Sequence, residues 1–553
     1  MVRCWAVAVV SSAMIASAAG VAAPAASAAS GDLSFADCVA LAGVEPCDEV
    51  GSLAHATGLG VSPDGEQVYA SSGDATGITA LDRGPTGKLT FNSCLGSRFT
   101  ASGCADFPFP LPVDGIPFGD LAVDPDGSAV YVASSGLNPS AAWALSRAPD
   151  GSLGFSACYG NTDGGAAPCD EGDSAFSDPK GIAIGPDGEH LYVAEHQFGS
   201  VYSLDIGNDL SLSLDRCLGD GPLCAGASSE TGIGATGVAA SPGSASVYVT
   251  GSRGDAPVGP STLQTFGRPG GAFSFLDCYG SGCTAGGNPI EQAAGVAVSP
   301  DDENVYVASG HASDGDDAVA VFDRAADGSL TKAGCVARDD HDGCEVPTSS
   351  GALAGVRDVV VSPDGGSVYA ASPTAITNFR RVADGSLKFF GCVADGGAFG
   401  CADPAPGRLE AIRNLALSPD GADVYATSLN SVVHFDRESL DATAPDLGLD
   451  WKPKQKLGGS IVVRGRCDED CSLAATGTIQ LSGVRGELEL KKAKGEAGSD
   501  QQVKLTLKPT GAAAKKLRKS DARRGRASVK VVATDEDGNA KAKRASIALS
   551  RRG

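Results

Sequence analysis

The sequence has few basic, aromatic and imidazole side chains. Its 553 residues include 43 Lys and Arg against 67 Asp and Glu, only 6 His and 3 Trp, and aromatic residues make up 6%. A net charge of −24 opposes binding of the whole chain to nucleic acid or to anionic membranes. The scarcity of His leaves few residues for a zinc site or for imidazole catalysis.

Long hydrophobic runs are also absent beyond the N-terminus. Residues 1–28 carry Arg3, an apolar run through Val21 and the small residues Ala26-Ser27-Ala28, which is the layout of a cleaved signal peptide. A membrane anchor is the alternative, but the run is rich in Ala and Ser and has no stop-transfer flank. We therefore expect a secreted or cell-envelope protein whose mature chain has no transmembrane span.

One motif recurs seven times along the chain: a Ser-Pro-Asp-Gly-type turn with a Tyr six residues after the Pro. Apolar residues flank each turn, which predicts two β-strands joined by a tight turn. The spacing of 56 to 63 residues between turns suits a four-stranded sheet with sizeable loops. The turn prolines and their tyrosines are Pro63 and Tyr69, Pro125 and Tyr131, Pro186 and Tyr192, Pro242 and Tyr248, Pro300 and Tyr306, Pro363 and Tyr369, and Pro419 and Tyr425.

Two further strands are predicted in each repeat. The third ends near an Arg in six copies, at residues 78–83, 143–147, 263–268, 319–324, 376–381 and 432–437. The fourth has apolar residues two positions apart and then a Cys, as in Leu89, Phe91 and Cys94.

The two ends of the repeat array complement each other. The last copy, residues 415–437, lacks a fourth strand, whereas residues 32–38 resemble a fourth strand without the other three. Donating the N-terminal strand to the last sheet would close a ring and leave no free sheet at either end.

The repeated pattern of Ser-Pro-Asp, Val-Tyr-Val, Phe-Asp-Arg and Asp-Gly-Ser-Leu, as at residues 299–330, resembles the seven-bladed β-propellers of the YVTN and lactonase-like family. The resemblance covers about residues 31–440 and implies an all-β fold: a seven-bladed β-propeller closed by the N-terminal strand. The family includes sugar-lactone hydrolases, cycloisomerases and envelope proteins. Its catalytic residues are not part of the repeat, so none is transferred to this chain.

Sixteen of the 17 cysteines fall into close pairs, one after each fourth strand and one further along the chain. Local disulfides are the simplest interpretation, whereas zinc would need ligands that converge. The predicted pairs are Cys38–Cys47, Cys94–Cys104, Cys158–Cys169, Cys217–Cys224, Cys278–Cys283, Cys335–Cys344, Cys392–Cys401 and Cys467–Cys471. No metal site is predicted.

The face of the ring that carries the disulfide loops varies most between copies, so we expect any site there. The candidate catalytic residues are Glu195, His196 and His311, which could act as a general base on water. The candidate binding residues are Lys180, Arg253, Arg357 and Arg413. The alternative is that all are solvated loop residues.

Acidic clusters in these loops could hold calcium, although none forms a recognised calcium loop and solvated carboxylates are the alternative. They are Asp48-Glu49, Asp170-Glu171, Asp339-Asp340, and Asp314 with Asp316-Asp317. No other cofactor is expected.

The repeats stop near residue 440. Residues 441–553 alternate apolar and polar positions at 459–464, 503–507 and 528–533, which predicts a small β-sandwich. The segment 533–539 resembles the final hairpin of bacterial immunoglobulin-like domains. This region holds 24 Lys and Arg against 14 Asp and Glu, whereas residues 1–440 hold 19 against 53. A basic C-terminal domain could bind an anionic cell-wall polymer.

We therefore predict a signal peptide at residues 1–28, a propeller at 29–440 and an immunoglobulin-like domain at 441–553. The expected function is a secreted or envelope binding scaffold for an unidentified protein, glycan or small molecule, and not for nucleic acid. An extracellular lactonase-type hydrolase is the alternative.

Overall fold

A computed structural model describes residues 32–41, 46–74, 77–96, 104–109, 117–136, 140–161, 169, 171–219, 224–225, 234–243, 246–252, 261–268, 271–281, 283, 290, 292–310, 317–340, 343–382, 384–404, 408–438, 445–469, 471–482, 484, 486–499, 501–534 and 540–551. The predicted signal peptide and the candidates Arg253 and His311 lie outside these residues. Among the helices in these ranges, none has the length and apolar content needed to cross a membrane.

Each sequence repeat forms one antiparallel sheet. The first four sheets are β3 (Ala56–Val61), β4 (Gln67–Ser72), β5 (Gly77–Arg83), β6 (Leu89–Gly96) and β7 (Ala105–Asp106); β8 (Phe118–Val123), β9 (Ala129–Ser134), β10 (Ala141–Arg147), β11 (Leu153–Gly160) and β12 (Glu171–Gly172); β13 (Pro179–Ile184), β14 (His190–Glu195), β15 (Ser200–Ile206) and β16 (Leu212–Leu218); and β17 (Ala235–Ala240), β18 (Val247–Ser252), β19 (Ser261–Gly267) and β20 (Ser274–Tyr279).

The next two sheets are β21 (Ala293–Val298), β22 (Asn304–Ser309), β23 (Ala318–Arg324) and β24 (Leu330–Ala337), and β25 (Asp358–Val361), β26 (Ser367–Ser372), β27 (Ala375–Arg381) and β28 (Leu387–Ala394). Two short 3₁₀ helices, η2 (Ser350–Leu353) and η3 (Asp395–Gly400), flank the latter. The last sheet combines β29 (Leu415–Leu417), β30 (Asp423–Ser428) and β31 (Ser431–Arg437) with β1 (Leu33–Ala40) and β2 (Asp48–Glu49) from the N-terminus.

The Ser-Pro-Asp-Gly segments form the hairpin turns between the first two strands of each sheet. In the first copy the Gly65 N–H donates to Ser62 O at 2.8 Å, and the Ser62 hydroxyl donates to Asp64 Oδ1 at 2.6 Å. Gly65 has φ +73°, a left-handed conformation that glycine adopts without steric cost. The turn motif therefore specifies a compact, self-bonded corner.

Neighbouring sheets are joined by the repeated Tyr and Arg. The Arg381 Nε donates to the Tyr306 hydroxyl at 2.8 Å, and the same guanidinium lies 2.7 Å from Asp301 in the turn of the preceding sheet. Six tyrosines accept such a bond from the next sheet: Tyr69 from Arg147, Tyr192 from Arg268, Tyr248 from Arg324, Tyr306 from Arg381, Tyr369 from Arg437 and Tyr425 from Arg83. Since Tyr425 belongs to the last sheet and Arg83 to the first, this contact also joins the two ends of the array.

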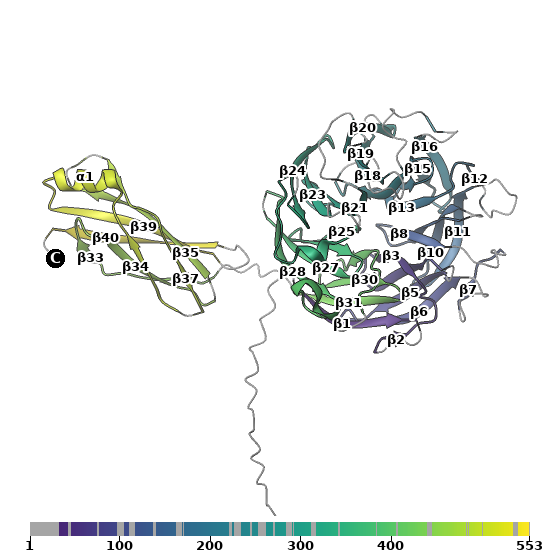
Figure 1. Cartoon of the computed structure of the whole chain (residues 1–553), viewed down its shortest axis with the longest axis horizontal. Coiled ribbons are helices and arrows are strands. Elements are labelled where there is room, and N and C mark those ends of the chain that lie inside the picture. The colour runs from purple at the N-terminus through teal and green to yellow at the C-terminus, as the bar shows by residue number, and fades with distance from the viewer. Residues whose placement is uncertain are drawn as a thin grey trace, which may run out of the picture.

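The sheets stand around a common axis in a β-propeller arrangement (Figure 1). The first strand of each sheet contacts the first strand of the next, and β29 contacts β3, so these strands line the centre. The N-terminal strand β1 pairs antiparallel with β31, with Phe35 opposite Phe435 and Leu33 opposite Arg437. The predicted pairing of these two segments is confirmed.

All eight predicted disulfides are present, seven of them directly after a fourth strand. Several of the second cysteines lie beside a short parallel pairing with the fourth strand, as between Val39 of β1 and Asp48 of β2. Each bond therefore holds the start of the loop that leads to the next innermost strand.

Residues 445–551 form a second unit with its own core. A three-stranded sheet contains β32 (Gly448–Asp450), β34 (Ile461–Arg466) and β38 (Val503–Leu507); the larger sheet contains β33 (Lys454–Lys456), β40 (Ala540–Ser550), β39 (Arg524–Thr534), β35 (Cys471–Leu481), β36 (Glu487–Glu489) and β37 (Ala493–Ala497). Buried side chains of both sheets share one apolar cluster. The Lys- and Arg-rich residues 511–519 form a helix, α1 (Gly511–Lys519), capped by the Thr510 side chain and packed through Ala513 and Leu517.

Candidate functional site: the central cavity

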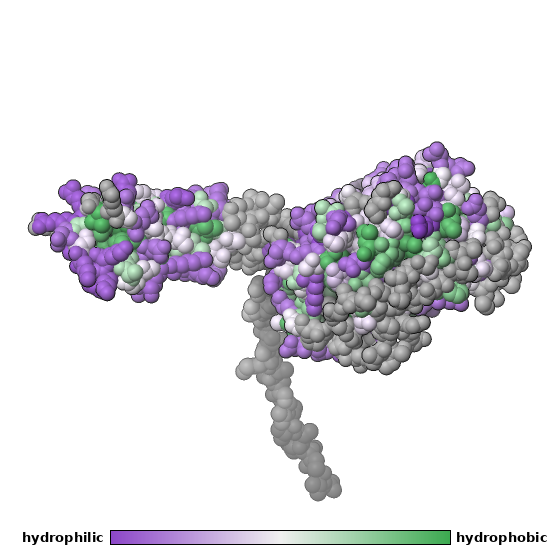
Figure 2. All heavy atoms as spheres, turned by 90° about the horizontal axis from the view of Figure 1, so that it is seen from above, coloured by the Kyte–Doolittle hydropathy of each residue, from purple (hydrophilic) through white to green (hydrophobic). Residues whose placement is uncertain are grey.

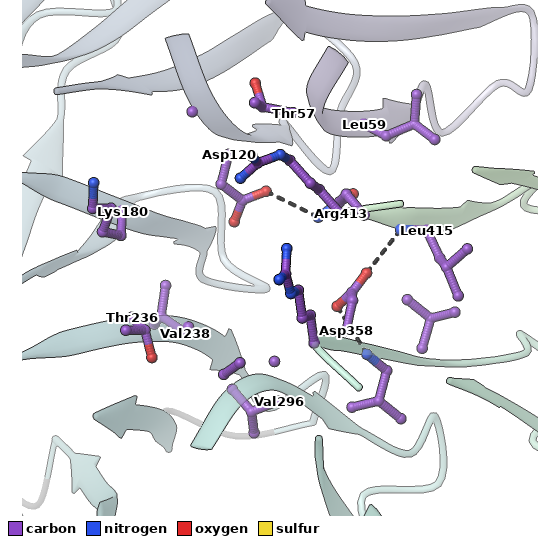
Figure 3. Close-up of a pocket in the computed structure, with 18 of the residues that line it drawn as sticks. Thr57, Leu59, Asp120, Lys180, Thr236, Val238, Val296, Asp358, Arg413 and Leu415 are labelled. Atoms are coloured by element: carbon purple, nitrogen blue, oxygen red, sulfur yellow. Dashed lines mark hydrogen bonds between the residues drawn. The ribbon is translucent and has the colours of Figure 1, made fainter. Parts of the chain in front are cut away.

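The first strands enclose a cavity of about 870 Å³ at the centre of the ring (Figure 3). Residues from all seven first strands line it, among them Thr57, Asp120, Lys180, Thr236 and Arg357. The polar and charged side chains belong to the beginnings of these strands, which the disulfide loops enter. The lining also reaches Val361, Leu417 and the turn residue Pro363, so the charged groups lie at the end of the cavity that the disulfide loops enter.

The position five residues before each turn proline distinguishes the repeats. Four copies have Gly there, at Gly58, Gly181, Gly237 and Gly295. A Cβ atom on Gly237 would lie 2.3 Å from Ala294 O, and one on Gly58 would lie 2.5 Å from Gly119 O, so neighbouring backbones pack too closely for a side chain. The other three copies place Asp120, Asp358 and Asn414 at this position.

The two carboxylates bridge adjacent first strands. Asp358 accepts from Val359 N at 2.9 Å and, across the gap, from Leu415 N at 2.7 Å. Asp120 accepts from Leu121 N at 2.9 Å and from Ile182 N at 3.3 Å. Each Asp thus replaces the close backbone contact made by a Gly elsewhere in the ring.

Both carboxyl groups have raised pKa values. Loss of hydration in the cavity wall raises the pKa of Asp358 to about 7, and the charge of Asp120 adds to the shift, while two backbone N–H donors oppose it. Loss of hydration likewise raises the pKa of Asp120 to about 6 against two backbone donors. At neutral pH the cavity therefore holds a carboxyl group, that of Asp358, which can accept or release a proton.

Three cations stand one residue before this position, at Lys180 in β13 and at Arg357 and Arg413, which precede β25 and β29. Lys180 forms an ion pair with Asp178 at 2.8 Å. Within the described part of the chain neither Arg357 nor Arg413 forms an ion pair, and both side chains are exposed. Loss of hydration and the like charge of Arg413 lower the pKa of Arg357. The two guanidiniums, on adjacent sheets, are thus available to bind an anion.

The predicted catalytic residue Glu195 has a structural role. Its fully buried carboxylate accepts from the backbone N–H groups of Asp178, Gln197 and Phe198 at 3.1, 3.0 and 2.8 Å. Burial raises the pKa of Glu195, although these three donors oppose the shift. The carboxylate caps the turn that follows β14 and is not among the residues that line the central cavity.

His196 also lies away from the cavity. Its Nδ1 is buried and lacks a hydrogen-bond partner among the described residues, and Gly234 lies against the ring. The structure thus brings together three of the predicted binding residues, Lys180, Arg357 and Arg413, but not Glu195 and His196 with them.

The acidic clusters are partly described. Asp317 is fully buried and pairs with Arg338 at 3.2 Å, and Asp48 pairs with Lys88 at 3.1 Å. Asp170, Asp314 and Asp316 lie outside the described residues. In the described part of the chain the residues spaced closely enough to share a metal ion are Asp423, His434 and Asp436, which belong to none of these clusters. Calcium binding stays a prediction.

Sequence reasoning missed Asp120, Asp358 and Asn414. The signal was present, because aligning the seven copies on their turn prolines shows Asp or Asn where the others have Gly. The repeated motif drew attention to what the copies share, whereas the site uses the positions where they differ.

No protein-family model and no curated protein matches this chain. Solved structures similar to it include a periplasmic gluconolactonase from Pseudomonas aeruginosa, 13% identical, covering 79% of this chain and 97% of that chain with a TM-score of 0.43. A protein from Lactobacillus plantarum is 18% identical over 61% of this chain and 84% of that chain, TM-score 0.41. The C-terminal WD40 domain of Sif2 is 12% identical and covers 69% of this chain and 96% of that chain, with a TM-score of 0.42. At such TM-scores these similarities carry no argument about function.

Proposed function

We propose that this is a secreted or envelope-associated binding protein in which a seven-bladed β-propeller, closed by its N-terminal strand, binds a small anionic ligand at the central mouth. Residues 441–553 form an immunoglobulin-like accessory domain, and residues 1–28 are a signal peptide. Arg357 and Arg413 hold the anionic group of the ligand, with Lys180 on the opposite part of the ring.

The unpaired guanidiniums of Arg357 and Arg413 carry this proposal. Residues 1–440 have a large excess of carboxylates, and the Arg residues at the ends of the third strands are used in contacts between sheets. Two adjacent Arg side chains left without a carboxylate partner, in a cavity of about 870 Å³, repel each other until an anion binds. The cavity volume matches that of ordinary small-molecule sites.

The test is isothermal titration calorimetry with citrate in low-salt buffer. We expect the double variant Arg357→Ala/Arg413→Ala to bind citrate at least about tenfold more weakly than wild type, since two charge-assisted contacts are lost. The control is Lys332→Ala/Lys388→Ala, which removes the same charge from the exposed fourth strands β24 and β28. Equal affinity in all three proteins, or no binding by wild type, contradicts the proposal.

Lactone hydrolysis is a second candidate, favoured by the pKa of about 7 at Asp358. Its carboxylate would take a proton from water as the oxygen attacks the lactone carbonyl; a guanidinium would stabilise the oxyanion, and the ring C–O bond would break as the leaving oxygen takes up the proton.

For this candidate we expect hydrolysis of glucono-δ-lactone, corrected for the spontaneous rate, to rise with pH through about 7, because the base must be ionised. Asp358→Asn should reduce the corrected rate at least about a hundredfold, the usual contribution of a general base. The control is the exposed Asp209→Asn. A rate unchanged in Asp358→Asn would remove this candidate and leave the binding proposal intact.

A further inference from the structure

One face of the larger C-terminal sheet is lined by cations. Alternate residues of β39 point to the same side, and those opposite the buried Ala527, Val529 and Val531 are exposed. The register extends this face across β40 and β33, since paired residues share a side. The cations on it, which we call the basic face, are Lys454, Lys456, Arg524, Arg526, Lys530 and Arg544.

No carboxylate balances these cations on the same three strands. The other described residues on this side of β39 and β40 are Ser, Ala, Val and Thr. None of the six cations has an ion pair within the described part of the chain, and the nearest acidic strands on the sheet, β36 and β37, lie beyond β35. Figure 2 shows hydrophilic residues around the visible side of this unit, with hydrophobic patches between them.

Lys530 and Arg544 lie directly opposite each other on adjacent strands. Like charges in such a cross-strand pair repel each other and destabilise the sheet. An anion bound between them would remove this repulsion. This differs from the opposite face of the hairpin, where Lys541 and Lys543 lie 3.1 and 3.8 Å from Asp446.

The surroundings of this pair indicate the kind of ligand. A shallow hollow of about 350 Å³ is lined by Lys530 and Arg544 with the hydroxyls of Thr476, Thr478 and Ser528; Glu489 of β36 also lines it. Arg526 stands four residues before Lys530, about 13 Å along the strand. Charges at intervals with hydroxyl groups between them suit a linear chain of hydroxylated anionic units.

The same face lacks the features that other polyanions require. Its described residues include no aromatic side chain on which bases could stack and no large apolar group that could enter a bilayer. We propose that the basic face binds a linear acidic polysaccharide, with Lys530 and Arg544 holding one anionic unit. This inference is independent of the ligand proposed for the central cavity.

The experiment uses the full chain and immobilised alginate, a polymer of uronic acids, in biolayer interferometry at low salt. We expect Lys530→Glu/Arg544→Glu to bind at least about tenfold more weakly than wild type, and wild-type binding to weaken as salt screens the charges. Lys530→Gln/Arg544→Gln should show a smaller loss in the same direction, and it tests the site should the Glu variant fail to fold.

The matched control is Lys504→Glu/Lys508→Glu, which makes the same charge change on and directly after β38 in the other sheet and should bind as wild type does. Equal weakening of both double variants would mean a response to net charge alone and would overturn the proposal. Unchanged binding of Lys530→Glu/Arg544→Glu, or binding of double-stranded DNA as tight as that of alginate, would also overturn it. Poly(glycerol phosphate), an anionic polymer without sugar units, is measured in parallel, and binding to it in preference to alginate would overturn the assignment to a polysaccharide.

Discussion

His434 is a buried histidine surrounded by carboxylates. It is fully buried on β31, with Nε2 2.9 Å from Asp423 of β30 and Nδ1 3.3 Å from Asp37 of β1. Asp436 lies 3.7 Å away, Tyr425 stacks on the ring at 5.0 Å, and Arg83 of the first sheet also binds Asp423. A protonated imidazole therefore links the N-terminal strand to the last sheet at the junction with the first.

We expect stability to depend on the charge of His434. Burial of the imidazole lowers its pKa, but hydrogen bonds with Asp37 and Asp423 outweigh this and raise it to about 9. Because the folded pKa exceeds the unfolded value of about 6.5, the stabilisation is complete below pH 6.5 and is lost as pH rises through 9. The loss amounts to up to about 3 kcal/mol of unfolding free energy.

The measurement is urea denaturation with disulfides intact, at several pH values from 6 to 9.5. Wild type should lose stability over this window, whereas His434→Gln, less stable at pH 6, should change little across it. Parallel pH profiles for the two proteins would show that this histidine is not charged in the native state.

At the scale of elements, the Tyr–Arg contact connects each sheet to the next. The third sheet shows what happens without it: its third strand β15 ends at Ile206 rather than Arg, and Tyr131 of the second sheet instead bonds to Asp124 at 3.3 Å within its own sheet. The contact thus needs the Tyr of one repeat and the Arg of the next, and the junction between the second and third sheets lacks it.

Arg381→Ala should lower the unfolding free energy by about 3 kcal/mol or more, because it leaves the buried Tyr306 and nearby acceptors without their charged donor. The control Lys388→Ala removes an exposed ion pair with Glu345 from the same sheet and should cost less than about 0.5 kcal/mol. Chemical denaturation of both variants compares the two. Equal small effects would show that the contact between sheets is not a source of stability.

At the scale of the whole molecule, charge divides the chain into two parts of opposite sign. The ring, built from residues 32–438, is rich in acidic residues, and two guanidiniums without an ion pair among the described residues, those of Arg357 and Arg413, lie at its central cavity. The C-terminal unit is basic, and six of its cations lie together on one sheet face. The two proposed sites are therefore both places where positive charge is left without a carboxylate partner.

The local structure of this protein could be predicted from its sequence alone. Pro63, Asp64 and Gly65 specify a turn through fixed φ, a side-chain acceptor and a left-handed residue, and such signals act within a few residues. The alternation of apolar and polar residues specified which side of each strand is buried, and the close spacing of the cysteines within each pair specified the disulfides. The pairing of β1 was predictable as well. The last repeat lacks a fourth strand, and the N-terminal segment has the pattern of a fourth strand without the other three.

Which side chains become neighbours could not be predicted from the sequence, because it depends on how distant strands are arranged. Arg357 and Arg413 are 56 residues apart in the sequence, and only the contact between β25 and β29 makes them neighbours. Lys530 and Arg544 become a pair only through the register of β39 with β40. Glu195 looked available for catalysis until the turn after β14 brought three N–H donors to its carboxylate. These outcomes depend on ring closure and strand register, which are set by packing over the whole domain and leave no mark within any short stretch of the chain.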